Sequence, residues 1–347
     1  METAMVADLA DAGPEEFDTL DPTAGAAGCY HRLRQRQADR RWSTGYLRAR
    51  EGGRLTAAIP VYALRGRSWP SHHYDPATWP LPEQLRAGLS PATCLLVGGC
   101  ADGRSGLPAR GPADRLGRLV AELAGYAAAQ DRCLVFPYLA GAARAALTEA
   151  TGDRVVWVPL RREAHLRGAT DPAWERALGS KVRGVLRRDR RRIAAAGLTG
   201  SVHGWTELAD EAGELVAGHN VRLGEPDHPE FARMRYAEWH ECAGVEVVVI
   251  RVAGAGVTGV LTALVWRDEL ELCEVGLTAG DSPDRLAAYL DLVFHRPLAL
   301  ARERGLRHLR LGSAAEVPKR SRGAVFTELY GGVLDREQTR RLAGARG

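Results

Sequence analysis

The sequence contains very little lysine. Of its 47 basic residues only two, Lys181 and Lys319, are lysine, and the remaining 45 are arginine. An ammonium group is a compact charge with freely rotating donors, whereas a guanidinium group is a broad planar fork, so the two are not interchangeable at every site. The two lysines therefore indicate positions that arginine cannot fill. The alternative is that two exposed lysines persist by chance in a composition rich in Ala, Gly and Arg.

The sequence also lacks the patterns of metal-binding, disulfide-rich and membrane proteins. Its six cysteines form no CxxC pair and follow no regular spacing, so neither a zinc site nor a disulfide framework is predicted. No stretch reaches 18 apolar residues, and the N-terminal segment METAMVADLADAGPEEFD is acidic and has no basic region followed by an apolar run. We expect a cytoplasmic protein with no membrane contact, no metal and no cofactor.

The composition is that of a globular protein with one strongly basic segment. At 347 residues and 45% hydrophobic content the chain can form two domains with buried cores. Residues 181–192 (KVRGVLRRDRRR) carry seven basic residues and one acid, a net charge of +6 in a chain whose total is +4. Because the basicity is local, we expect one surface that contacts an anion rather than a diffusely cationic protein.

The first half of the sequence predicts a mixed sheet entered through a hairpin. Strand-like runs surround a Glu-Gly-Gly turn signal, and later apolar runs alternate with amphipathic segments. The expected elements are a hairpin at 45–64, strands at 93–99, 132–139 and 154–160, and helices at 111–130 and 140–150. Strand, helix and strand in this order predict an α/β fold.

The second half repeats that order. A basic helix at 181–196 ends at Gly197, a residue type that helix ends favour. The elements expected after it are strands at 245–253, 257–266, 269–277, 306–311 and 325–330, a helix at 283–304 and a loop at 312–324. Hairpin, strand, long helix and strand thus occur twice, which predicts a duplicated α/β fold. We expect a first domain at 1–170 and a second at 171–347, each a mixed and mostly antiparallel sheet flanked by helices.

Two segments carry a resemblance to a known family. The first is the helix SKVRGVLRRDRRRIAAAG (180–197). The second is RERGLRHLRLGSAAEVPKRSRGA (302–324), which contains a helix ending in Gly, a short strand with Gly, and a loop with Lys, two residues, a large residue and Gly. They resemble the Fem-type ligases, and the order of elements in each half resembles the Gcn5-related N-acetyltransferase (GNAT) fold. The resemblance implies two GNAT-like domains in tandem and an enzyme that takes an aminoacyl group from aminoacyl-tRNA and joins it to an amine. Pro318 and Arg322 depart from the family, which usually has aromatic residues there.

The loop of the second segment has the chemistry of an anion-binding site. Gly312 allows the backbone to approach a ligand closely, and Lys319, Arg320 and Arg322 place three cations on a short loop. Such cations can hold a phosphate or neutralise the oxyanion that forms when an amine attacks an ester carbonyl. The resemblance implies that Lys319 is the catalytic residue that stabilises this intermediate, and we assign Gly312, Ser313, Arg320 and Arg322 to substrate binding. The alternative is a solvated hairpin loop.

The basic helix suits a phosphate backbone. Arginine forks can bind phosphates, as in the acceptor stem of a tRNA or in a nucleotide-linked substrate. The arginines are spread around more than half of the helix circumference, so one solvent-facing side does not account for all of them. The candidates for tRNA binding are Lys181, Arg183, Arg187, Arg188 and Arg191. The alternative is a solvated helix at a domain junction.

Four further residues are less specific candidates. Glu274 lies mid-strand and could act as a catalytic base that accepts a proton from the attacking amine. Tyr289 lies on the 283–304 helix, and Tyr74 and Asp75 lie in a loop rich in Pro, Trp and His that could line a substrate pocket. Each has a simpler explanation: a charge on the solvent side of a sheet, a core aromatic residue, or a rigid surface loop.

These patterns favour aminoacyl-tRNA-dependent transfer to a small-molecule acceptor, with formation of an amide or ester, as in specialised metabolism and antibiotic biosynthesis. The coiled-coil arm that some Fem ligases insert has no room in 171–240, which favours a small acceptor. One alternative is an acyl-coenzyme-A-dependent N-acyltransferase, although neither strand-to-helix junction has the Gln/Arg-x-x-Gly-x-Gly/Ala pyrophosphate loop. Another is an inactive tandem domain that binds nucleic acid through 181–192.

Overall fold

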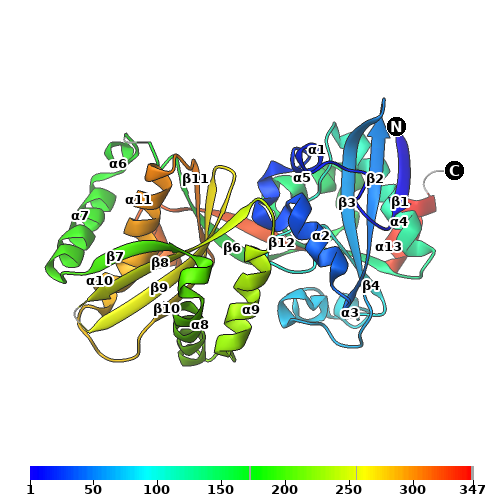
Figure 1. Cartoon of the computed structure of the whole chain (residues 1–347). Helices are drawn as coiled ribbons and strands as arrows, with labels where there is room; N and C mark the ends of the chain where they lie inside the picture. Colours follow the sequence, from blue (N-terminus) through cyan, green and yellow to red (C-terminus); the bar gives the residue numbers. More distant parts are fainter. Residues whose placement is uncertain (172, 255, 345–347) are drawn as a thin grey trace. The chain divides into compact units, whose positions relative to one another are not determined.

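The structure, a computed structural model, describes residues 1–171, 173–254 and 256–344 (Figure 1). The chain forms two compact units: unit 1 comprises Met1–Arg161 and Glu328–Gly347, and unit 2 comprises Arg162–Thr327. The domain division at residue 170 stays a prediction. The compact units differ from it because the C-terminal segment packs with unit 1.

Unit 1 is built on a mixed sheet. Its strands are β1 (Glu2–Val6), β2 (Trp42–Glu51), β3 (Arg54–Leu64), β4 (Cys94–Val97), β5 (Cys133–Ala140) and β12 (Val325–Leu334). They lie in the order β1-β2-β3-β4-β5-β12, in which β4 and β5 run parallel and the other neighbours antiparallel. Its principal helices are α2 (Tyr30–Ala38), α4 (Ala113–Ala128), α5 (Gly141–Thr151) and α13 (Arg336–Gly344).

The central strands of this sheet are buried because they are apolar throughout. Every residue of β4 (CLLV) and nearly every residue of β5 (CLVFPYLA) is buried, as expected for a parallel pair covered on both sides. α4 packs on the core that contains Leu95 and Phe136. Their neighbours Leu96 and Val135 belong to a second core, because successive residues of a strand point to opposite faces.

Unit 2 repeats the arrangement with six further strands among the described residues. Its strands are β6 (Val156–Arg167), which begins in unit 1, β7 (Thr199–Gly204), β8 (Val245–Gly254), β9 (Val257–Trp266), β10 (Glu269–Leu277) and β11 (His308–Gly312). They lie in the order β6-β11-β10-β9-β8-β7, with β10 and β11 parallel. The helices are α6 (Trp174–Ala177), α7 (Ser180–Ala195), α8 (Trp205–Arg222), α9 (Pro229–His240), α10 (Arg285–Leu290), the π-helical turn η6 (Asp291–His295), α11 (Arg296–Glu303) and α12 (Glu316–Arg320).

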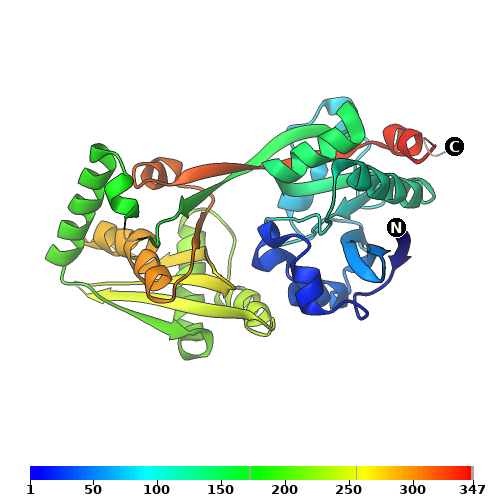
Figure 2. The ribbon, with the colours of Figure 1, turned by 90° about the horizontal axis from the view of Figure 1, so that it is seen from above.

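Helices cover both faces of the sheet in unit 2. A side chain added at Gly276 of β10 would meet the backbone of Leu215 in α8, whereas one added at Gly259 of β9 would meet the Leu292 side chain in η6. Gly259 pairs with Leu277, the neighbour of Gly276. Therefore α8 and the continuous helix α10–η6–α11 lie on opposite faces. Figure 2 shows the orange helix beside the yellow strands.

Each repeat ends with a strand that pairs outside its own repeat. β6 follows β5 and α5 in the chain, yet it pairs antiparallel with β11, with His308 opposite Arg167. β12 follows β11, yet it pairs antiparallel with β5, with Leu329 opposite Ala140. The exchange explains why the C-terminal segment belongs to unit 1. Sequence patterns cannot reveal it, because the two strands occupy the same position in each repeat.

The predicted strands and long helices are confirmed, with one local correction. The helix expected at 283–304 corresponds to α10, η6 and α11. The loop expected at 312–324 is not a simple loop, because it contains α12, which follows Ala314 and Ala315 in the left-handed conformation. Alanine rarely adopts that conformation, so the sequence gives no sign of this helix start. Among the described helices, none is both long and apolar enough to cross a membrane.

Candidate functional site

The turn between β11 and α12 has a strained backbone. Gly312, Ala314 and Ala315 have positive φ angles of 69°, 62° and 47°. The left-handed conformation costs a residue with a Cβ roughly 1–2 kcal/mol, so two in succession need compensating contacts. A Cβ at Gly312 would lie 3.3 Å from the carbonyl oxygen of Leu272 in β10. The turn is therefore held close to β10.

Lys319 holds this turn in place. The residue is 4% exposed, and its Nζ donates to the carbonyl oxygens of Gly312 at 3.1 Å and Ser313 at 2.6 Å. Burial lowers the pKa of the ammonium to about 8, although the carboxylates of Glu163 and Glu316 act in the opposite direction. An ammonium has three N–H donors. Two of the three are donated to the backbone.

Arg322 is fixed by Asp189 of α7. Its Nε and Nη2 donate to the two carboxylate oxygens at 2.7 and 3.0 Å, and its Nη1 donates to the carbonyl oxygen of Pro318 at 2.9 Å. Burial acts to raise the pKa of Asp189, but His295 and Arg322 hold it below its usual value. The guanidinium group of Arg322 is thus already engaged by hydrogen bonds within the protein. Substrate binding by Arg322 stays a prediction that these contacts do not favour.

The exposed cations of α7 that have no partner among the described residues lie on one side of the helix. Leu186 and Asp189 are buried, and at 3.6 residues per turn the positions opposite them face outward. These outward positions hold Lys181, Arg187, Arg188, Arg191 and Arg192, all exposed and without a hydrogen bond or ion pair among the described residues. Arg190 points elsewhere and pairs with Glu175 at 2.8 Å, and Arg183 donates to backbone carbonyls just before the helix. The arginines therefore span more than half of the helix circumference, as expected, but only some of them are without a partner in the described part of the chain, and tRNA binding by them stays a prediction.

A cavity of about 490 Å³ lies between the start of α7 and α12. Its lining consists of Lys181, Val182, Val185, Glu316, Val317, Arg320 and Ser321. Val317 is 80% exposed, so the cavity opens to solvent. The guanidinium carbon of Arg320 lies 5.2 Å from the centre of the Phe326 ring, which presents the guanidinium as a flat surface. Glu316 also lines the cavity and pairs with Arg320 at 3.4 Å, so the apolar walls are combined with the cation of Lys181, which has no ion pair among the described residues.

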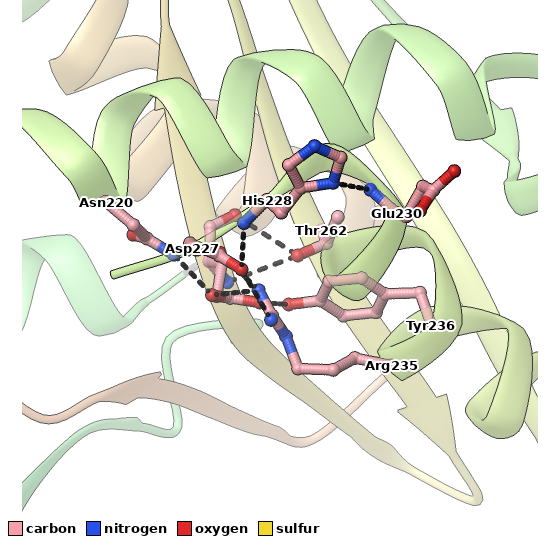
Figure 3. A network of polar contacts seen from close by, with 8 residues as sticks. Asn220, Asp227, His228, Glu230, Arg235, Tyr236 and Thr262 are labelled. Carbon is pink, nitrogen blue, oxygen red and sulfur yellow. Dashed lines mark hydrogen bonds and ion pairs between the residues drawn. The ribbon is translucent and has the colours of Figure 1, made fainter. Parts of the chain in front are cut away.

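A polar network surrounds Glu274 at a bulge of β10 (Figure 3). The register between β9 and β10 shifts within residues 272–275. The Glu274 carboxylate accepts hydrogen bonds from the Tyr236 hydroxyl at 2.6 Å, from Asn220 Nδ2 at 3.0 Å and from Arg235 Nη2 at 3.1 Å. Glu274 is thus held by α8 and α9. A bulge commonly redirects a side chain in this way.

Asp227 completes the network. Arg235 donates to both of its carboxylate oxygens, at 3.0 and 2.8 Å, and Asn220 donates at 2.9 Å. These hydrogen bonds, that of Arg235 first, lower the pKa of Asp227 to about 2. Two carboxylates therefore share one guanidinium, and Glu274 remains 28% exposed. Because its carboxylate already accepts three donors, a base at Glu274 would need one of them to move away, and this role stays a prediction.

The comparisons with known proteins show a fold and no close relative. No protein-family model and no curated protein sequence matches the chain significantly. The structure resembles FemX over 99% of this chain and 99% of that one, with 10% identity and a TM-score of 0.63. The chain has the fold of FemX. A conserved protein from Bacteroides thetaiotaomicron matches 94% of this chain and 98% of its own, at 13% identity and a TM-score of 0.57. The C-terminal domain of a protein named as a lysylphosphatidylglycerol synthetase, from Agrobacterium fabrum, matches 87% and 84%, at 13% identity and a TM-score of 0.50.

Identities this low show the fold alone, and the FemX fold confirms the predicted architecture of two GNAT-like domains in tandem. The structure of this chain also brings several predicted site residues together. Lys319, Gly312 and Ser313 meet in one turn, while Lys181 and Arg320 line the adjacent cavity. These residues come from segments more than a hundred positions apart in sequence.

Tyr289 of α10 is close enough to Arg322 to respond to its charge. Burial raises the pKa of Tyr289, and the Arg322 charge acts in the opposite direction. The tyrosine also packs against the core of unit 2. Its assignment to substrate binding stays a prediction.

Tyr74 and Asp75 lie in unit 1, where local contacts use both side chains. The Tyr74 hydroxyl donates to the carbonyl oxygen of Ala101 and accepts the N–H of Gly103 at 2.9 Å. Asp75 accepts the N–H of Ala77 at 3.0 Å and so begins the next helical turn. These contacts fix the loop, and the assignment of both residues to substrate binding stays a prediction.

Sequence reasoning missed a buried charge cluster on the sheet in unit 2. Arg310 of β11 is 2% exposed, and its guanidinium lies 2.5 Å from Glu269, 3.1 Å from Glu271 and 3.6 Å from Glu163. Burial acts to lower the pKa of Arg310, but the three carboxylates raise it above its usual value. The sequence signal for this cluster is the recurrence of charged residues between apolar ones in ELELCE and LRHLRL. It could be used only once the parallel pairing of the two strands was known.

The described part of the chain holds no group of three or more His, Cys, Asp or Glu residues placed to bind a metal ion. The prominent chemistry of unit 2 is therefore that of an exposed cationic surface, a cavity beside it, and buried charge networks behind them.

Proposed function

We propose that the chain is an enzyme, an aminoacyl-tRNA-dependent transferase that joins the aminoacyl group to a small-molecule acceptor. The observation that carries this proposal is the continuous cationic side of α7, which leads at Lys181 into the cavity beside the turn held by Lys319. Lysine and arginine along such a surface can neutralise successive phosphates of a nucleic acid. The sequence resemblance to Fem-type ligases and the name of the Agrobacterium neighbour both fit transfer of an aminoacyl group.

In this proposal the acceptor stem lies along α7 and the aminoacylated end enters the cavity. Arg187, Arg188 and Arg191 bind backbone phosphates, while Lys181 and Arg320 bind the last phosphates at the cavity. The valine walls contact the apolar faces of the terminal sugar and base. Arg183 positions the start of α7 through its backbone contacts, so its contribution to tRNA binding is indirect.

The reaction needs no covalent enzyme intermediate, because the aminoacyl ester is already activated. The amine or hydroxyl of the acceptor attacks the ester carbonyl carbon, the carbonyl oxygen gains negative charge, and the ribose oxygen leaves with a proton. The remaining donor of Lys319 stabilises the oxyanion, and Glu274 is the candidate acceptor for the attacker's proton. Charged tRNA as donor is consistent with the cytoplasmic location that the sequence predicts.

The test is to incubate the protein with total charged tRNA, and separately with acetyl-coenzyme A, each with a mixture of small-molecule amines. The measurements are release of uncharged tRNA and release of free coenzyme A. We expect protein-dependent deacylation of one class of charged tRNA and no consumption of acetyl-coenzyme A. Consumption of acetyl-coenzyme A alone would instead identify an acyl-coenzyme-A-dependent N-acyltransferase. Binding of tRNA without either reaction would identify an inactive nucleic-acid-binding protein.

A further inference from the structure

Two cysteines face each other at the centre of the sheet of unit 1. Cys94 of β4 and Cys133 of β5 are partners in the parallel register, and their Sγ atoms lie 3.4 Å apart. They are 1% and 2% exposed. Cα atoms on neighbouring strands lie about 4.8 Å apart, which is inside the range that disulfides span. A bond would therefore need side-chain rotation that brings the sulfurs roughly 1.3 Å closer, and little movement of the backbone.

A cavity of about 480 Å³ connects Cys133 to the surface. Its lining includes the exposed residues Gln84, Gly88 and Glu337, and of the described residues around it Cys133 is the one thiol. Arg336 lines the cavity together with Asp335 and Glu337, so this side of the cavity is polar.

We propose that Cys94 and Cys133 form a reversible thiol–disulfide site that reacts with low-molecular-weight disulfides. The site is separate from the surfaces assigned above to transfer, so it does not depend on the proposed function. The two cysteines differ in their access to the cavity and in their hydrogen bonding. Cys133 reaches the cavity, whereas Cys94 lies behind it and accepts the hydrogen bond from the Cys133 thiol. That hydrogen bond lowers the pKa of Cys94 and raises the pKa of Cys133.

The reaction proceeds in two exchanges. The Cys133 sulfur attacks one sulfur of the small disulfide, a mixed disulfide forms, and the first small thiol leaves with the proton. The Cys94 sulfur, which has the lower pKa, then attacks the Cys133 sulfur, and the second small thiol leaves. Two protein thiols are oxidised and one small disulfide is reduced to two thiols, so electrons and protons balance. The new bond joins β4 to β5 covalently.

The test uses the full-length protein with Cys100→Ser and Cys273→Ser. Cys100 shares the tryptic peptide 87–104 with Cys94, and Cys273 is exposed and reacts independently. After treatment with oxidised glutathione, free thiols are alkylated in denaturant and the protein is digested without reductant. We expect peptide 87–104 linked to peptide 133–144, and loss of the link after dithiothreitol. If Cys100→Ser does not fold, chymotrypsin can separate Cys94 from Cys100 in the unaltered chain, because Leu95 and Leu96 lie between them.

Single variants separate the two roles. Cys94→Ser should leave a stable glutathione adduct on Cys133, because no second sulfur can displace it. Cys133→Ser should leave Cys94 as a free thiol that alkylates only in denaturant. The linked protein should also unfold about 5–10 °C higher than the reduced protein, since the cross-link closes a loop of some forty residues. A persistent adduct on Cys133 while Cys94 is present, or two free thiols after prolonged treatment, would overturn the proposal.

Discussion

The two units share one topology and differ in what lies beside their parallel strands. In unit 1, residues 94–96 pair in parallel with residues 133–135. In unit 2, residues 269–271 pair in parallel with residues 308–310. The strand that follows the long helix then bends at a positive φ angle in both, at Tyr138 in unit 1 and at Gly312 in unit 2. The duplication therefore extends to the backbone irregularity at the end of this strand.

Beyond that point the two units diverge. In unit 1 the chain after β4 returns and pairs on both sides, with Ala109 opposite Ala57 and Ser105 opposite Leu139. A cavity of about 310 Å³ lies beside this segment and is lined by Leu107, Ala109 and Arg110 among others. In unit 2 the segment after β11 contains Lys319, and the bulge of β10 carries the network around Glu274. The proposal places the transfer chemistry in unit 2, where Lys319 holds the strained turn and the cations of α7 that have no partner among the described residues lead to a cavity.

The largest expected effect concerns the buried ion pair of unit 2. Arg322→Ala would leave Asp189, whose side chain is 7% exposed, without its guanidinium partner. Loss of one partner from a buried pair costs roughly 3–5 kcal/mol. We expect the free energy of unfolding to fall by that amount in urea titrations. The double variant Asp189→Asn, Arg322→Met removes both charges and should recover part of the lost free energy of unfolding. Equal losses in the single and double variants would contradict the explanation.

Lys319 tests whether charge in unit 2 serves catalysis as well as folding. Removing a donor to an oxyanion costs on the order of 3 kcal/mol, about a hundredfold in rate. Lys319→Ala should therefore slow single-turnover transfer from charged tRNA about a hundredfold while leaving tRNA affinity unchanged. Lys319→Arg keeps the charge but replaces a compact donor by a fork that fits the turn poorly. Full activity in that variant would reduce Lys319 to a generic positive charge, and Arg307→Ala, which removes an exposed cation elsewhere in unit 2, provides the matched control.

The pH dependence separates the two contributions of Lys319. Its pKa in the folded protein is about 8, below the ordinary value of 10.5. Between these values the unfolded state binds more protons than the folded state, so the free energy of unfolding should rise with pH relative to Lys319→Met. Activity should fall over the same range as the ammonium is lost. A parallel rise of both would show that the neutral amine is the active form.

Unit 1 provides the contrasting case of a buried charge with no part in transfer. Asp102 accepts hydrogen bonds from Arg32 at 2.8 Å and Arg36 at 2.7 Å. Burial acts to raise the pKa of Asp102, but the charges of Arg36 and Arg32 lower it to about 2. The stabilisation is present above the unfolded-state pKa near 4 and is lost as the pH falls through about 2.

Asp102→Asn isolates that charge, because asparagine tolerates the left-handed conformation of this residue, whose φ is 68°. We expect a loss of about 2 kcal/mol in the free energy of unfolding at neutral pH, calculated from the pKa difference. The free energy of unfolding should also decrease less at low pH in the variant than in the unaltered protein. Single-turnover transfer should be unchanged, and a slowed chemical step would contradict the assignment of chemistry to unit 2 alone.

The sequence predicts the duplicated fold well because apolar periodicity and helix ends are local signals. It also singles out Lys319, through the rarity of lysine and the resemblance of the surrounding segment. It cannot show that Lys319 and Arg322 are already engaged by Gly312 and Asp189, since those contacts depend on tertiary packing. The same holds for Arg235, which no motif marks and which joins two carboxylates only after α9 packs beside β10.

The smallest expected change concerns the exposed side of α7, because its arginines contribute little to folding. Arg187, Arg188 and Arg191 changed together to Ala should leave the free energy of unfolding within about 0.5 kcal/mol, as exposed substitutions usually do. Binding of tRNA should weaken, and the slope of log affinity against log salt should become shallower by about one unit for each phosphate that is no longer neutralised.

The matched control for this change lies in unit 1. Arg54, Arg65 and Arg67 are exposed, and among the described residues they form no ion pair, so their replacement by Ala removes the same net charge from a different surface. If α7 is the tRNA-binding surface, the control variant should keep the salt slope of the unaltered protein. The three replaced arginines would contact no phosphate, and their attraction at longer range is screened by salt. If both triple variants lower the slope equally, α7 contributes only to overall charge, and the RNA must bind elsewhere. If only the α7 variant lowers it, the decrease in slope gives the number of phosphates that this side of the helix neutralises.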